Sequence, residues 1–193
     1  MSTPLPGKRP GTYADLEQVP DTKVAELIEG ELYVSPRPAP LHALTSSALG
    51  GELHNPFGRG RGGPGGWWIF DEPELHFGRN VLVPDLAGWR RDRLPAMPKE
   101  AYFTLAPDWV CEVLSPSTAS LDRVKKLRVY ATERVKHAWI IDSLARTLEV
   151  FRLEGVAYLL VGQYVGDELV RAEPFDAIEL DLLVLWGEER AAK

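Results

Sequence analysis

The sequence predicts a mixed α/β (α+β) fold in a single domain that spans residues 1–193. Three observations favour this class. Residues 41–53 and 121–131 carry apolar side chains at the spacing of a helix. Most of the remaining apolar residues fall in short runs rich in β-branched and aromatic side chains, which are typical of strands. A chain of 193 residues is also long enough to bury about 70% of its unfolded surface in one core.

The first third of the chain is expected to hold two helices and a hairpin. Residues 1–11 contain three prolines and two glycines, which indicates an extended lead-in. Thr12 can cap the first helix, and Glu29-Gly30 can form the hairpin turn. Residues 55–66 are dominated by glycine and are expected to form a mobile surface loop. The helices cover residues 13–18 and 41–53, and the hairpin covers residues 24–36.

Most of the strands are expected after this loop. Ser120 can cap a helix that continues to about Glu133, and residues 187–193 form a charged tail. Residues 137–142 are nearly all apolar, which suits a buried central strand. Residues 180–186 fit either a last strand or a helix. The other expected strands cover residues 67–70, 74–77, 81–89, 109–114, 147–153, 156–164 and 168–171, the last three as a meander.

Composition and charge exclude several classes of protein. The formal net charge is −6, so nucleic-acid binding would need a local basic patch. The single cysteine, Cys111, excludes a disulfide framework and a cysteine-built zinc site. The N-terminal residues have no apolar stretch typical of a secretion signal. The longest uncharged apolar-rich run, residues 156–166, is too short to span a membrane. A soluble cytoplasmic protein is therefore expected.

Two acids interrupt apolar segments that should be buried. Asp85 lies within residues 81–89, and Glu112 lies within residues 109–114. A carboxylate in an apolar layer without partners costs several kcal/mol or takes up a proton. A shared cation such as Mg²⁺ would explain both acids, because hard divalent ions prefer carboxylate oxygens and water. The alternative is that each acid simply binds backbone amides or a nearby arginine.

Basic residues follow on the next helix. Lys125 and Lys126 flank its apolar stripe at similar angles, so helical periodicity does not choose between them. The alternative to a functional role is a solvated basic face on which Asp122 pairs with Lys126, worth about 0.2–0.5 kcal/mol. The expected apolar stripe consists of Leu121, Val124, Leu127 and Ala131.

An ordered set of motifs resembles the Uma-type family of restriction endonucleases. The motifs are Glu26-Leu-Ile-Glu-Gly-Glu31-Leu, the Ser-Pro…His42 stretch, Val-Pro-Asp85-Leu, Glu112-Val-Leu-Ser-Pro-Ser-Thr, Asp122 with Lys126 and Tyr130, and His-Ala-Trp139-Ile-Ile-Asp142. The family is similar to the PD-(D/E)xK nuclease superfamily. The resemblance implies a restriction-endonuclease-like mixed β-sheet flanked by helices, with an added antiparallel meander, and phosphodiester cleavage with Mg²⁺ or Mn²⁺.

The resemblance also implies roles for individual residues. Asp85 and Glu112 correspond to the catalytic and metal-binding acids. The superfamily lysine lies two residues after the second acid, where this chain has Leu114. In the Uma-type pattern a lysine four positions before a tyrosine replaces it, which selects Lys126 as the third catalytic residue. Glu31 matches an acid of the N-terminal motif and could be a further metal ligand, or simply face solvent. The resemblance also implies that His42 borders the site, and the alternative for this residue is a capping or packing role.

These inferences predict a Mg²⁺- or Mn²⁺-dependent endonuclease that hydrolyses phosphodiester bonds, with DNA as the expected partner. Basic residues around the site would contact nucleic acid, namely Arg90, Arg123 and Lys125. The alternative is a non-cleaving binding or assembly protein that keeps the fold, which the net charge and the displaced lysine favour. An acid/base hydrolase of another substrate is a weaker reading, because no sugar-binding aromatic cluster lies beside the two acids. No membrane partner is expected. The sequence does not decide whether the chain forms a homodimer.

Overall fold

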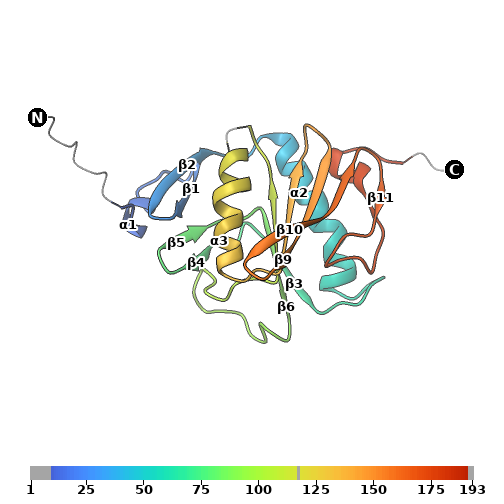
Figure 1. Ribbon diagram of the computed structural model, residues 1–193, viewed down its shortest axis with the longest axis horizontal. Helices are drawn as coiled ribbons and strands as arrows, with labels where there is room; N and C mark the ends of the chain where they lie inside the picture. The colour runs from blue at the N-terminus through green and yellow to red at the C-terminus, as the bar shows by residue number, and fades with distance from the viewer. Residues whose placement is uncertain (1–9, 117, 191–193) are drawn as a thin grey trace, which may run out of the picture.

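The computed structural model describes residues 10–116 and 118–190. Residues 1–9 of the expected lead-in and 191–193 of the expected tail lie outside the described residues. Helices lie on both faces of a large central sheet, and the N-terminal hairpin extends to one side of it (Figure 1). None of the described helices has the length and apolar character needed to span a membrane.

A six-stranded mixed sheet forms the centre of the molecule. Its strand order is β10-β9-β8-β7-β6-β3. β7 and β8 pair in parallel through a helical crossover, and the other neighbouring strands pair in antiparallel fashion. The sheet consists of β3 (Trp67–Asp71), β6 (Leu86–Arg90), β7 (Trp109–Val113), β8 (His137–Asp142), β9 (Thr147–Glu154) and β10 (Ala157–Val165).

Two smaller sheets complete the β structure. One has four strands in the order β2-β1-β5-β4, and its hairpin turns at Glu29 and Gly30, both with positive φ. It consists of β1 (Lys23–Ile28), β2 (Glu31–Pro36), β4 (Leu75–Phe77) and β5 (Asn80–Leu82). The other pairs β11 (Leu169–Val170) with β12 (Leu180–Asp181).

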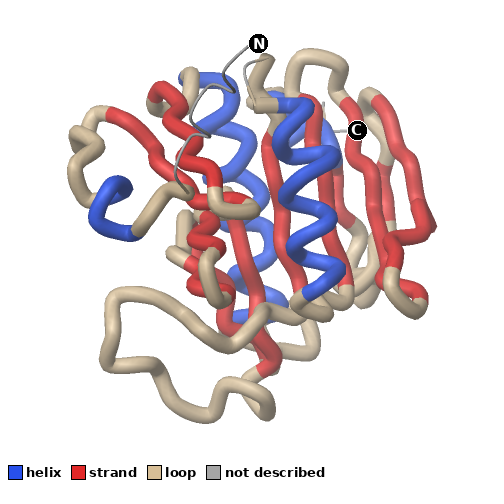
Figure 2. The backbone as a smooth tube through the Cα atoms, turned by 60° about the vertical axis from the view of Figure 1, so that its left-hand side comes forward, coloured by secondary structure: helices blue, strands red, loops and turns tan. Residues whose placement is uncertain are grey.

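Helices cover the two faces of the large sheet (Figure 2). The short α1 (Tyr13–Leu16) begins at the predicted cap Thr12, and Asp15 completes a capping box in which the two residues satisfy each other's backbone N–H groups. The remaining helical segments are α2 (Pro40–Leu53), the π-helical η1 (His54–Gly58) and η2 (Leu121–Lys126), α3 (Leu127–Thr132) and the 3₁₀-helical η3 (Leu182–Trp186).

Alternation along β7 divides the core into two layers. Trp109, Cys111 and Val113 belong to the cluster that packs against α2 and η3. Val110 belongs to the opposite cluster, which includes Tyr130 of α3. Because side chains on a strand alternate between faces, Glu112 points to the same side as Val110. The fold therefore directs this acid toward the helix that follows β7.

The structure confirms the predicted fold class but changes several elements. The run at residues 81–89 divides into β5 and β6, which belong to different sheets, because Pro84 lacks an N–H and ends the first strand. The loop expected over residues 55–66 begins with the π-helical η1, in which Phe57 is buried. Ser120 makes no side-chain cap, since it already has helical dihedral angles.

The apolar stripe expected on the second long helix is also wrong in part. Val124 is 53% exposed, whereas Asp122, Lys126 and Tyr130 are buried. The π-helical turn of η2 explains the difference, because its i→i+5 hydrogen bonds close a wider turn than the 3.6 residues of an α-helix. Residues four apart stay aligned on such a turn better than residues three apart. The buried face of this helix therefore begins with an acid and a lysine.

Candidate active site

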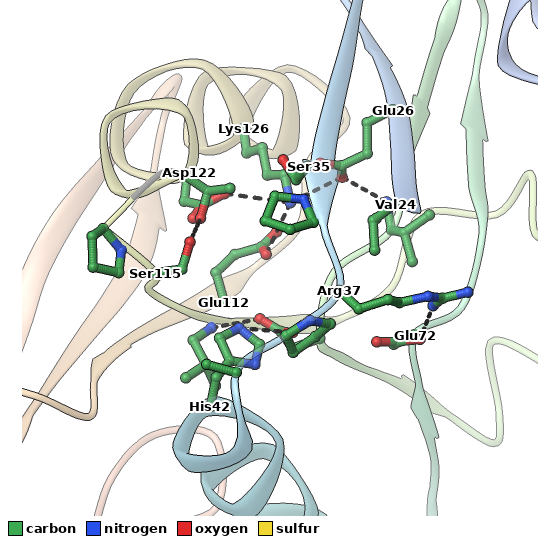
Figure 3. Close-up of a pocket in the computed structure, with 18 residues that line it drawn as sticks. Val24, Glu26, Ser35, Arg37, His42, Glu72, Glu112, Ser115, Asp122 and Lys126 are labelled. Atoms are coloured by element: carbon green, nitrogen blue, oxygen red, sulfur yellow. Dashed lines mark hydrogen bonds and ion pairs between the residues drawn. The ribbon is translucent and has the colours of Figure 1, made fainter. Parts of the chain in front are cut away.

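A pocket of about 220 Å³ opens where the hairpin, α2, the β5–β6 break, β7 and η2 meet (Figure 3). Carboxylates outnumber cationic side chains on its walls. The acids are Glu26, Glu72, Asp85, Glu112 and Asp122, and the cations are Arg37 and Lys126. The pocket therefore carries an excess of negative charge when its acids are ionised.

Lys126 lies at the back of this pocket among three buried acids. Its Nζ is 2.9 Å from Glu26 Oε1, 3.0 Å from Glu112 Oε2 and 3.4 Å from Asp122 Oδ1. All four side chains are at most 7% exposed. Burial by itself lowers the pKa of Lys126, but the charges of Glu112, Glu26 and Asp122 raise it well above its usual value. The lysine is therefore a fixed cation.

Glu112 is held through both of its oxygens. Lys126 binds Oε2, and the Tyr130 hydroxyl donates to Oε1 at 2.5 Å. Burial raises the pKa of Glu112 well above its usual value, and Lys126 lowers it only in part because Asp122, Asp85 and Glu26 add negative charge nearby. One lysine does not neutralise this cluster.

Asp85 lies directly before β6, beside Glu112 in the sheet. Leu86 pairs with Cys111 in antiparallel register, which sets Asp85 against Glu112. The Val113 N–H donates to Asp85 Oδ2 at 2.7 Å. On the other side, His42 Nε2 of α2 lies 3.3 Å from Asp85 Oδ1. Burial lowers the pKa of His42, but its hydrogen bond to Asp85 and the charge of that acid raise it overall.

Comparisons with known proteins concern the family and the fold of this chain. The model of the Uma2 family, described as "Putative restriction endonuclease", matches residues 10–183. The chain belongs to the Uma2 family. A solved structure from Anabaena variabilis ATCC 29413, described as a "putative nuclease belonging to DUF820", has 24% sequence identity and a TM-score of 0.75. The alignment covers 92% of this chain and 98% of that chain. A comparison with curated proteins finds no match.

These findings confirm the resemblance and the predicted nuclease-type fold. The likeness in structure concerns the fold, and the family description supports nuclease activity in general. The position of the pocket is consistent with the Uma2 motifs, because Asp85, Glu112 and Lys126 all line it. His42 also borders it, as the resemblance implies.

Four other predicted site residues lie away from the pocket. Glu31 is on β2 with its side chain 61% exposed, and it pairs with Lys125 at 2.9 Å. The Tyr33 hydroxyl also donates to Glu31. Arg123 pairs with Glu149, and Arg90 lies over the Trp67 ring at the far end of β6 from Asp85. The structure therefore corrects the placement of Glu31 beside the other two acids, and it gives all three basic residues partners elsewhere.

Two acids of the site were missed in the sequence. Glu26 interrupts the apolar run Val24-Ala25-Glu26-Leu27-Ile28, which is the same signal that singles out Asp85 and Glu112. Its Oε1 accepts the Val83 N–H at 2.9 Å as well as contacting Lys126. The sequence leaves two interpretations of Asp122 open, a position of the family motif and a surface pair with Lys126, and its side chain is only 3% exposed. The hairpin acid that reaches the site is thus Glu26, because its register on β1 directs it inward.

The donor chemistry of the pocket fits a divalent metal ion. Within residues 10–116 and 118–190, no group of three His, Cys, Asp or Glu side chains is arranged to hold a metal by itself. Mg²⁺, however, usually binds one or two carboxylates and keeps several waters. The oxygens of Asp85 and Glu112 have further lone pairs beyond the bonds described above. The excess of carboxylates would also be relieved by a cation.

Proposed function

We propose that this chain is a Mg²⁺- or Mn²⁺-dependent endonuclease that hydrolyses phosphodiester bonds in DNA, in the cytoplasm. One observation carries the proposal: Asp85, directly before β6, and Glu112, on the adjacent β7, line the same pocket as the buried Lys126. Such a pocket repels phosphate through its acids, so nucleic acid would bind well only with a cation present. Family membership supports nuclease chemistry over other uses of paired acids.

Asp85 and Glu112 would hold the metal ion. When bound, the ion would activate a water molecule and stabilise the charge that develops on the phosphate. Tyr130 and Lys126 fix the two oxygens of Glu112, and the Val113 N–H fixes Asp85. These contacts orient the two carboxylates before the substrate binds. Residues that hydrogen-bond to metal ligands usually have this role.

Lys126 and Arg37 would act on the phosphate. Lys126 would donate to the scissile phosphate or to the attacking water in place of its contact with Asp122, which at 3.4 Å is the longest of its three. Arg37 lies on the wall of the pocket with its side chain 53% exposed. Its Nε and Nη2 donate to the Asp21 carbonyl at 3.1 and 2.7 Å, and its Nη1 lies 3.8 Å from Glu72. The Asp21 carbonyl holds one edge of the guanidinium, so Arg37 would present its Nη1 to a phosphate in the pocket.

A non-cleaving nuclease-fold binding protein is the second candidate. One observation favours it: the basic residues Arg90, Arg123 and Lys125 have partners away from the pocket. Such a protein would bind DNA or another partner without cutting it.

A cleavage assay distinguishes the two functions. Single-stranded DNA, duplex DNA and RNA are incubated with the protein in Mg²⁺, in Mn²⁺ and in EDTA. We expect cleavage of DNA only with a metal, and its loss in Asp85→Asn and Glu112→Gln. Glu52→Gln, an exposed acid on α2, is the matched control and should cleave normally. Metal-independent cleavage, or activity in Asp85→Asn, would contradict the proposal, and binding without cleavage would favour the second candidate.

A further inference from the structure

The outer strand of the large sheet has the features of an interaction surface. β10 ends the strand order, with β9 as its neighbour in the sheet (Figure 2). A strand pairs with each neighbour through alternate backbone groups, so half of the N–H and C=O groups of β10 face outward. β10 is nine residues long, whereas β3 at the opposite edge has five residues. The longer edge offers a ready template for another strand.

β10 has no charge or proline to protect its edge, although the β-bulge between Leu160 and Gly162 interrupts its register and Glu168 accepts the Val165 N–H. Residues 156–166 contain no charged side chain and no proline, although charges and prolines are what usually block pairing at an edge. Several of their apolar side chains face solvent: Val156 is 80% exposed, Leu159 51% and Val165 57%. This run is too short to enter a membrane and takes no part in the pocket.

The charges at the two ends of β10 favour a second copy of the same strand. Arg134 donates to the carbonyl of Gly155 just before β10, and Asp167 follows its other end. Of the other acids near these ends, Glu154 pairs with Arg152 and Glu168 accepts the Val165 N–H, while Arg190 donates to the backbone carbonyl of Asp167. In an antiparallel pair of identical strands, the beginning of one lies beside the end of the other. Arg134 of one copy would then lie near Asp167 of the other.

We propose that two copies of this chain associate through antiparallel pairing of their β10 strands, which joins the two large sheets into one continuous sheet. Such a contact is the same on both copies, so it closes as a dimer. The uncharged middle of the strand pairs without repulsion, while Leu159 and Val165 lose their exposure to water. The pocket lies elsewhere in the fold, so the dimer does not depend on the proposed nuclease function.

Sedimentation velocity over a range of concentrations tests the proposal. The wild-type chain should sediment as a dimer, and Leu159→Lys should raise the dissociation constant at least about tenfold, because a lysine on an edge strand blocks its pairing with another strand. Leu144→Lys is the matched control, since Leu144 is 70% exposed but lies in the β8–β9 turn. It should remain dimeric.

Amide hydrogen exchange of the wild-type chain provides a second readout that needs no variant. Protection of the β10 amides should increase with protein concentration, while the amides of β3 should not change. A wild-type chain that stays monomeric at all concentrations would overturn the proposal, because β10 would then not pair with a second copy. A dimer that survives Leu159→Lys, or dissociates equally in Leu144→Lys, would also overturn it, as would unchanged protection of β10.

Discussion

Lys125 and Lys126 are adjacent in the sequence and lie in opposite surroundings. Lys126 is 5% exposed and touches three buried carboxylates. Lys125 is 33% exposed and contacts Glu31 and Tyr33 on the outside of the hairpin. Hydrogen bonds to Tyr33 and Glu31 raise the pKa of Lys125, whereas the charges of buried acids raise that of Lys126. Both lysines are charged, but only one balances charge that water cannot reach.

This difference indicates what each pair of charges can do. A surface ion pair is screened by water and contributes little to stability or chemistry. A buried cation among carboxylates holds them in fixed positions, and removing it leaves unpaired charge in the core. The same two residue types therefore form a structural surface contact in one case and a candidate catalytic centre in the other.

The largest effect is expected for Lys126→Met. Loss of the ammonium leaves Glu26, Glu112 and Asp122 without their cation, which should destabilise the fold by about 3–5 kcal/mol at neutral pH. Cleavage should fall at least about 100-fold, as for loss of a charge-stabilising donor. Chemical denaturation and the nuclease assay measure both. Lys125→Met is the matched control and should change neither. Equal effects of the two substitutions would remove the distinction between the lysines.

Stability should depend on pH in a direction set by the buried acids. Burial raises the pKa of Glu112, Glu26 and Asp122, so these groups bind protons more tightly in the folded chain than in the unfolded chain. Acids of this kind destabilise the fold above the ordinary carboxyl range of about pH 4. Lys126 stays charged in both states over this range and adds no slope.

Denaturant unfolding in EDTA measures this dependence. The free energy of unfolding should fall as the pH rises from about 4 to about 6, below the ordinary titration range of histidine. Glu112→Gln should flatten the curve, and Glu31→Gln should not. A stability that rises over this range, or curves of equal slope for wild type and Glu112→Gln, would show that the cluster is neutralised in another way.

A smaller effect is expected when the two hairpin acids are compared. Glu26→Gln keeps the size of the side chain but weakens the hold on Lys126, so cleavage should fall roughly 10-fold, as for other groups that support a metal site. Glu31→Gln should leave cleavage unchanged, because Glu31 binds Lys125 on the surface. Steady-state kinetics of both variants give the comparison. A greater loss of cleavage in Glu31→Gln than in Glu26→Gln would indicate that Glu31 belongs to the site.

Much of the fold could be predicted from local patterns. Turn residues and alternating apolar side chains placed the hairpin at Glu29-Gly30 and most strands within a few residues. The errors have physical causes: Pro84 ends β5, and the π-helical turn of η2 rotates Val124 to the surface. Neither the pairing between distant strands nor a π-helical turn can be read from the spacing of apolar residues.

The candidate site could be predicted only in part. The rule that an acid inside an apolar run needs a partner located Asp85 and Glu112, and it would have found Glu26 had it been applied to β1. Family resemblance rather than periodicity selected Lys126. The surface positions of Arg90 and Arg123 depend on which end of a strand or face of a helix meets the pocket, and the sequence does not contain that information directly.

Titration of Mn²⁺ into the protein, followed by calorimetry, tests most directly whether the pocket is a metal site. We expect the wild-type chain and Lys126→Met to bind Mn²⁺, since a lysine is not a metal ligand. Asp85→Asn and Glu112→Gln should lose binding, and Glu31→Gln should bind as the wild type does. Absence of binding in the wild-type chain, or unchanged binding in Asp85→Asn, would contradict a metal-dependent nuclease at this pocket.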